Sequence, residues 1–233
     1  MTHAPLKFAP PPERVAANED KGAQSERAYA AIRRRILLGE LPPGEKLRVE
    51  TLQRDLSLSS TPVREALNRL TSERLVSFEE NRGFRTAPLL ASDLRDIIRL
   101  RILAETDALR DAIACGDDAW EAGIVSANYR LTQHELRSRA RGEEWTALHK
   151  AFHLSLFAAC TYPRLLALCD QLFDETERYR RFAVRVGLAK RNVGVEHAQI
   201  MQAVLKRDAE QATRLVAEHV TVTANLVATS LGS

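Results

Sequence analysis

A helical repeat of apolar positions is the clearest pattern in the chain. Val63, Ala66, Leu67 and Leu70 recur at i, i+3, i+4 and i+7, a spacing that places four side chains on one face of a helix. Arg64 lies off this face. The pattern therefore predicts a helix that packs on one side and presents a polar surface on the other.

The surrounding pattern predicts a small mixed unit up to Pro88. Gly39 can end the first helix, and the Leu41 to Gly44 segment, with two prolines and a glycine, is typical of a turn. The predicted elements are a helix from Ser25 to about Gly39, a helix over 50–55, a helix from about Thr61, and short strands over 75–78 and 84–87. Three helices followed by a hairpin indicate a winged helix-turn-helix.

Beyond Pro88 the pattern is helical throughout. Ser92 and Asp117 are candidate caps for the first two helices. Six helices are expected, with approximate bounds 92–115, 117–139, 142–160, 163–187, 193–207 and 208–231. We therefore expect a mainly α protein with three regions: a disordered tail over 1–24, a winged helix-turn-helix over 25–88, and an all-α bundle over 89–233.

Composition and charge narrow the class of protein. The formal charge of the whole chain is +3, and residues 26–88 alone hold 12 Lys and Arg against 9 Asp and Glu, an excess of the same size. A basic excess located in one region favours a nucleic-acid partner there. The three cysteines show no CxxC spacing, and no apolar run is long enough to span a membrane. We expect a cytoplasmic protein without a membrane association.

Three segments of the first region resemble the GntR superfamily of transcription regulators. The similarity is carried by the Ile36 to Leu47 segment, by the Ser59 to Leu67 segment and by Arg82-Gly83-Phe84. The similarity covers residues 26–88 and implies a DNA-binding domain that contacts operator DNA. The chain departs from the family pattern at Ser60, where the family usually has arginine.

The resemblance assigns the DNA contacts by position. It implies that the operator is contacted by Ser59, Thr61, Arg64, Arg82 and Gly83. An arginine fork can donate two hydrogen bonds to guanine O6 and N7, and a glycine at a basic wing tip allows the backbone to approach a minor groove. An ion pair between Arg64 and a glutamate on its own helix is the alternative.

The helical remainder resembles the ligand-sensing domain of the FadR subfamily, the FCD type. The matching segments are Arg101 to Glu105, Phe152-His153, Glu196-His197 and Glu218-His219. In metal-binding members of that subfamily, one aspartate and three histidines hold a single ion. The histidines match here, but the aspartate position holds His149.

Four histidines are therefore the predicted metal ligands: His149, His153, His197 and His219. The first two are four residues apart, so they share one helical face. An imidazole set without a carboxylate favours zinc, with nickel or cobalt possible, over magnesium or calcium. A neutral, hydrogen-bonded histidine cluster is the alternative.

Arg101 is the predicted effector-binding residue. It matches the position where the family usually places an arginine that binds a carboxylate, a role that suits the planar guanidinium. A surface ion pair with Glu105, four residues later, is the alternative. The family often has asparagine where this chain has Tyr162, so the identity of the effector does not transfer.

Together these features predict a homodimeric transcription repressor whose binding to operator DNA is controlled by a small organic acid at a metal site. A metal-dependent hydrolase or lyase that uses the four histidines is an alternative, although no glutamate is placed as a general base, as it is in HExxH enzymes. We therefore expect a protein that is not an enzyme. A zinc ion that only stabilises the bundle also remains open, because four ligands can close a tetrahedral site.

Overall fold

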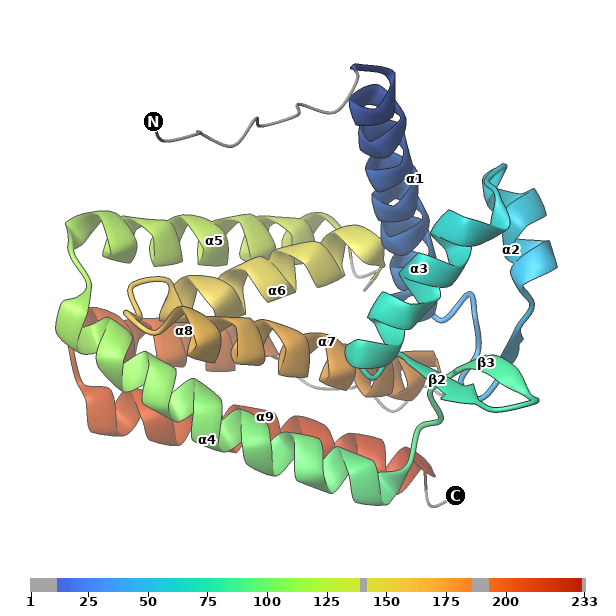
Figure 1. Ribbon diagram of the computed structural model, residues 1–233. Helices are drawn as coiled ribbons and strands as arrows, with labels where there is room; N and C mark the ends of the chain where they lie inside the picture. Colours follow the sequence, from blue (N-terminus) through green and yellow to red (C-terminus); the bar gives the residue numbers. More distant parts are fainter. Residues whose placement is uncertain (1–11, 139–141, 186–192, 232–233) are drawn as a thin grey trace, which may run out of the picture. The chain divides into compact units, whose positions relative to one another are not determined.

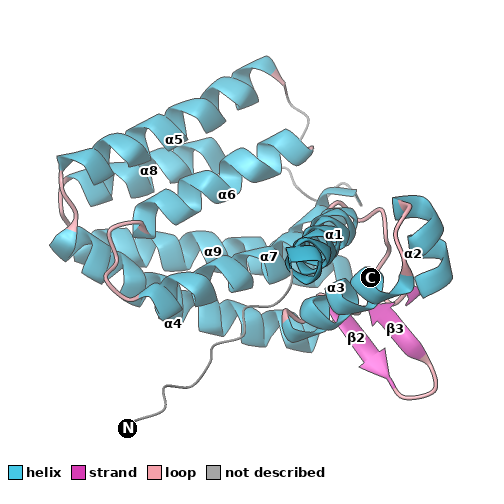
Figure 2. Cartoon of the chain, turned by 45° about the horizontal axis from the view of Figure 1, so that its top comes forward, coloured by secondary structure: helices cyan, strands magenta, loops and turns pink. Residues whose placement is uncertain are grey.

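The computed structural model describes residues 12–138, 142–185 and 193–231. Its backbone divides into two compact units, one made of most of residues 12–87 and the other of residues 88–231. All of the described strands belong to the first unit (Figure 2). The described residues contain no helix that is long and apolar enough to cross a membrane.

The first unit, which we call the head, is a winged helix-turn-helix. Its three strands form an antiparallel sheet in the order β1-β3-β2, with Phe78 opposite Phe84 in the β2–β3 hairpin. In chain order the described elements of the head are α1 (Pro12–Leu37), β1 (Lys46–Leu47), α2 (Val49–Leu56), α3 (Ser60–Ser72), β2 (Val76–Glu79) and β3 (Gly83–Thr86).

The apolar face predicted for α3 is the buried face of that helix. Val63, Ala66, Leu67 and Leu70 are each at most 2% exposed, whereas Arg64 is exposed. Gly39 adopts a φ of 72° just after α1, a conformation that glycine reaches without a steric penalty. The helix and its boundary follow from local sequence features.

The prediction of a disordered tail over 1–24 is wrong for residues 12–24, which belong to a helix. Helix α1 begins at Pro12 rather than Ser25, while residues 1–11 lie outside the described part. Residues 12–24 contain three alanines and two glutamates, which favour helix. Since the later turns of α1 already form a nucleus, adding residues to the same helix costs little.

The second unit, which we call the bundle, consists entirely of helices in its described part. Figure 1 shows α4 beside α9, and α4 also packs against α7, while α5 packs against α6 and α8. The elements are α4 (Ala91–Cys115), α5 (Asp118–Arg137), α6 (Glu143–Phe157), α7 (Pro163–Arg185), α8 (Val193–Leu205) and α9 (Ala209–Leu231). The predicted fold class, a winged helix-turn-helix followed by a helical bundle, is confirmed.

Local signals set some of the helix ends in the bundle. The Asp117 carboxylate accepts a hydrogen bond from the backbone N–H of Trp120 at 2.8 Å, as expected for a helix cap. Ser92, in contrast, lies inside α4, whose N-cap is Leu90. The phenol of Tyr179 lies 2.8 Å from the Asp93 carboxylate and bonds to the backbone of Leu90, so tertiary contacts define the start of α4.

Candidate functional site

The bundle gathers four histidines from three helices into one buried cluster. His149 and His153 come from α6, His197 from α8 and His219 from α9. Each is at most 6% exposed, and one ring nitrogen from each lies within 4.8 Å of those of the others. The sequence placed two of these residues on one face, and the fold brings the other two to them.

The spacing of the rings fits a single small cation. The Nε2 atoms of His149 and His153 are 3.2 Å apart, and the ring centroids of His197 and His219 are 4.9 Å apart. Four nitrogens bound to one zinc ion at 2.0–2.1 Å lie about 3.4 Å from one another in a tetrahedron. The nitrogens of the cluster, all within 4.8 Å of one another, would have to approach by up to about 1.4 Å to share one such ion.

The surroundings keep the imidazoles of His149 and His153 neutral, which is the form that binds metal. Burial is the main cause that lowers the pKa of His149 and His153 well below the usual value of 6.5, and neighbouring histidines lower it further. The Nδ1 atoms of His149 and His153 are buried and have no hydrogen-bond partner among the described residues. Buried polar atoms without partners are costly, and a cation bound at the two neighbouring Nε2 atoms would offset part of the free-energy cost of the cluster, although not through Nδ1 itself.

A carboxylate orients one of the four rings. Nδ1 of His219 lies 3.0 Å from Oε2 of Glu196. The two residues are on different helices, and the packing of α8 against α9 brings them together. A carboxylate in this position favours the tautomer with the proton on Nδ1, which leaves Nε2 free to coordinate. The sequence indicated Glu196 only as the neighbour of His197.

Arg101 lies next to the histidines, and it is paired with Glu105 inside the protein. The Nε atom of Arg101 donates to Oε1 of Glu105 at 2.5 Å, and the two residues are only 5% and 1% exposed. The Arg101–Glu105 ion pair expected in the alternative does form, but it is buried and does not lie on the surface. Arg101 also lines a cavity of about 20 Å³ together with His149, His153 and His219.

Helix α7 contributes residues that our sequence analysis missed. Phe173, Thr176, Glu177 and Arg180 line the same small cavity. They lie at i, i+3, i+4 and i+7, which places them on one helical face, and polar residues at such a spacing within a bundle helix are the signal that could have identified them. The guanidinium of Arg180 stacks on the Trp145 ring, with Cζ 4.3 Å from the ring centroid.

In the head, a second group of candidate residues borders an open hollow of about 430 Å³. Arg64 from α3 and Arg82 and Gly83 from the wing line it, together with Lys46 and Arg48 from the other side. Arg64 forms no ion pair with any residue in the described ranges, so the alternative of a helix-surface pair is not seen. Ser59 is the N-cap residue of α3 and Thr61 lies in its first turn, and neither borders this hollow.

The wing tip depends on a left-handed backbone. Gly83 has a φ of 78°, and a Cβ there would meet no atom within 4 Å, so conformation rather than crowding selects glycine. Arg82 is 73% exposed and its Nη1 lies 3.2 Å from the Glu79 carboxylate. The tip thus presents the Arg82 guanidinium and, at Gly83, a backbone without a side chain.

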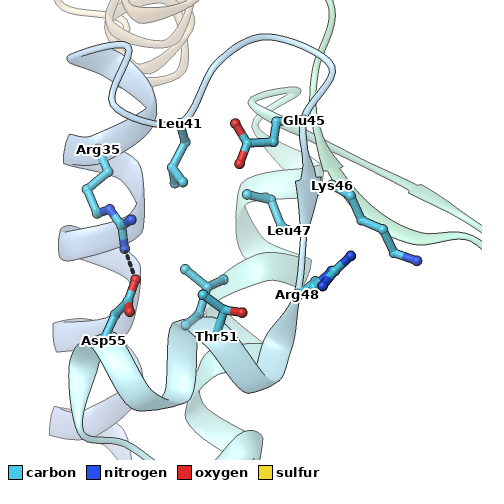
Figure 3. Close-up of a pocket in the computed structure, with 9 residues that line it drawn as sticks. Arg35, Leu41, Glu45, Lys46, Leu47, Arg48, Thr51 and Asp55 are labelled. Atoms are coloured by element: carbon cyan, nitrogen blue, oxygen red, sulfur yellow. Dashed lines mark hydrogen bonds and ion pairs between the residues drawn. The ribbon is translucent and has the colours of Figure 1, made fainter.

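A neighbouring hollow of about 390 Å³ has a structural explanation (Figure 3). Arg35 and Asp55 form an ion pair at 2.9 Å on one wall, which joins α1 to α2, and buried Leu41 and Leu47 belong to the core of the head. Figure 3 shows that the Lys46 side chain points away from this ion pair. We assign no ligand to this hollow.

Comparisons with known proteins agree with both units. Residues 24–85 match the family described as bacterial regulatory proteins, gntR family, and residues 96–222 match the FCD domain. The chain is 33% identical over 199 residues to the uncharacterized transcriptional regulator BphR of Paraburkholderia xenovorans, covering 84% of this chain and 81% of BphR. It is also 33% identical to the Escherichia coli transcriptional repressor GlaR, covering 82% and 90% of the two chains.

A solved structure of a related fold is Escherichia coli McbR/YncC. It matches with a TM-score of 0.78 at 20% sequence identity, and the match covers 89% of this chain and 98% of that one. The relatives above are named as transcriptional regulators, which gives no support to the hydrolase or lyase alternative. The chain thus belongs to the GntR family of bacterial DNA-binding transcription regulators, in the branch that carries an FCD domain, and it is not an enzyme.

Proposed function

We propose that this regulator is a homodimeric repressor whose operator binding is controlled by a small carboxylate at a metal site in the bundle. The observation that carries the proposal is the convergence of four buried histidines within 4.8 Å, beside the buried Arg101. The name of one relative, the repressor GlaR, supports the direction of regulation. The protein would act in the bacterial cytoplasm.

The metal ligands would be His149, His153, His197 and His219, with zinc the preferred ion and nickel or cobalt possible. Bound there, a dication would polarise and hold a carboxylate oxygen of the effector. The side chain of Arg101 would bind the carboxylate through its guanidinium, since its two Nη atoms have no hydrogen bond to a described residue. Glu196 would hold His219 in its coordinating tautomer.

The operator contacts would come from Ser59, Thr61, Arg64, Arg82 and Gly83. The exposed Arg64 would read a guanine edge in the major groove, while the wing tip approaches a minor groove. We assign DNA binding to residues 25–88, and effector binding, metal binding and dimerisation to residues 89–233. Two heads in a dimer imply a pseudo-palindromic operator.

Control of DNA binding requires that the effector bind the two states of the protein with different affinity, because equal affinity would shift no equilibrium. The site is buried inside the bundle and its cavity is only about 20 Å³, so an effector can enter only if helices move. The state with moved helices would then bind the effector more tightly than the closed state. We expect the acid to release the protein from DNA.

The test uses the full chain and an operator selected from random duplexes. Metal content is measured by elemental analysis, and gel shifts are run with a panel of organic acids before and after chelation. We expect about one ion per chain, and an acid-induced release from DNA that disappears on chelation while operator binding persists. Loss of folding on chelation would instead support a purely structural ion, and an acid response that needs no metal would refute the proposal.

A further inference from the structure

A second buried arginine borders the histidine cluster from α7. Arg180 is 8% exposed and lines the same cavity as Arg101 and His149. Its Nε donates to Glu177 at 2.5 Å and its Nη2 also contacts that carboxylate, but its Nη1 is buried without a hydrogen-bond partner among the described residues. A buried guanidinium nitrogen with no acceptor is a site that an anion can fill.

The two arginines approach different members of the cluster. Arg101, on α4, acts electrostatically on His153, whereas Arg180, on α7, acts on His149. Their guanidinium groups rest on different aromatic rings, Arg101 on Phe173 with Cζ 5.3 Å from the centroid and Arg180 on Trp145 at 4.3 Å. The cavity therefore has two separate cationic groups with donors available for a ligand.

The charge balance of the cluster favours an anionic ligand. Four neutral imidazoles cannot offset a bound dication, and the change of the family's aspartate to His149 removes a protein carboxylate that would have offset half of it. Glu105 and Glu177 are already matched by Arg101 and Arg180, and Glu196 beside His219 supplies one negative charge. An uncompensated buried charge is costly, so an anionic ligand is favoured, and the two separate arginines of the cavity favour a ligand with two charged ends.

We propose that the effector is a small dicarboxylate, with one carboxylate held by Arg101 and the other by Arg180 on the two sides of the histidine cluster. This inference rests on the proposed metal-dependent function. Arg180 becomes the residue that distinguishes a diacid from a monoacid. The sequence resemblance assigned no role to it.

The carboxylate of Glu177 competes with this ligand for the guanidinium of Arg180. The cavity of about 20 Å³ holds no more than roughly one water, so a diacid can bind only if the Arg180–Glu177 pair separates. Glu177 would retain partners, because its carboxylate also lies 3.0 Å from the Thr146 hydroxyl and 3.2 Å from Nε of Arg181. Removing the charge of Glu177 should therefore strengthen diacid binding.

The test is calorimetric titration of the full-length, metal-loaded protein with pairs of acids of equal chain length: malonate and propionate, succinate and butyrate, glutarate and valerate. We expect at least one diacid to bind roughly 10- to 100-fold more tightly than its monoacid partner, as a charge-assisted hydrogen-bonded pair provides. Sulfate, a dianion with a single charge centre, should bind more weakly than that diacid.

Three variants separate recognition from folding. Arg180→Gln should remove the preference for the diacid while metal content and monoacid binding stay unchanged, and Glu177→Gln should tighten diacid binding. The double variant Glu177→Gln with Arg180→Gln removes both charges of the ion pair, so it keeps the fold if Arg180→Gln alone does not, and it should also lack the preference. Arg214→Gln, at an exposed position on α9, is the control.

Three kinds of result would overturn the inference, and they are distinguishable from one another. Stoichiometric metal with equal binding of diacids and monoacids, or with sulfate bound as tightly as the best diacid, would refute the two-arginine ligand and leave the metal site intact. Protein that cannot be loaded with metal would remove the proposed function and this inference with it. Unchanged diacid preference in the double variant would exclude Arg180 as the second anchor.

Discussion

The two units place their candidate functional residues in opposite environments. In the head, Arg64 and Arg82 project into solvent from a small, well-packed frame, whereas the four histidines of the bundle are at most 6% exposed. An exposed arginine acquires its energetic importance only when DNA excludes water from it. A buried imidazole affects stability before any ligand binds. Function and stability should therefore separate in the head and be coupled in the bundle.

Removing two histidines should have the largest effect. The double variant His153→Ala with His197→Ala eliminates ligands from two helices, so we expect metal content to fall from about one ion per chain to near zero. Elemental analysis after equilibrium dialysis measures it, and far-UV circular dichroism checks the helices. His134→Ala is the matched control, because His134 faces Glu144 and lies outside the cluster. His3→Ala should also be silent, although His3 lies outside the described residues. Stoichiometric metal in the double variant would refute the assignment.

Acidification should destabilise the metal-free bundle. The pKa values of His149 and His153 lie well below the unfolded value of about 6.5, mainly because of burial, so the unfolded chain takes up protons that the fold excludes. Stability is present above about pH 6.5 and is lost as the pH falls toward the folded pKa, by up to about 1.4 kcal/mol per pH unit for each histidine.

Urea unfolding of chelated protein at several pH values measures this slope. The variant with both histidines replaced by glutamine should show a flatter profile, and an equally steep one would contradict the assignment. The same lowered pKa values reduce the competition of protons with metal. The ion should therefore be released at a lower pH than an ion held by an exposed histidine pair.

Arg64→Ala tests the opposite environment. We expect a loss of about 1 to 3 kcal/mol of binding free energy on the specific operator, with no change in the thermal stability of the head, because the side chain is exposed. Gel-shift titrations measure it, with Arg74→Ala as a control at an exposed position that does not border the hollow. Unchanged operator affinity would exclude base reading, and an equal loss on all sequences would indicate a phosphate contact.

Ser60→Arg should have the smallest effect and the opposite sign. It restores the arginine that the family usually has at the start of α3, where Ser60 is exposed. One additional phosphate contact should steepen the dependence of log affinity on log salt by about 0.9 and tighten binding at low salt. A cation at a helix N-terminus costs about 0.3–1 kcal/mol of stability, which a thermal melt would detect. An unchanged salt slope would mean that this position does not face the backbone of the DNA.

Local sequence signals determined much of the head. The apolar spacing of α3, the glycine after α1 and the wing hairpin each depend on neighbours within a few residues, and each is present in the structure. Strand β1 escaped prediction because its two residues are a strand only through pairing with β3, where Lys46 lies opposite Arg85. The extension of α1 to Pro12 escaped it because an existing helix lowers the cost of further turns.

In the bundle, the sequence by itself determined the six helices and the pair of ligands on α6, because helical periodicity and an i, i+4 spacing are local properties. The resemblance to a known family added His197 and His219. Only the tertiary structure decided that α8 and α9 bring those two rings to the pair, that the Arg101–Glu105 pair is buried, and that α7 adds Arg180. These are contacts between residues distant in the chain, and their burial and pKa depend on which helix faces pack together, which no local pattern specifies.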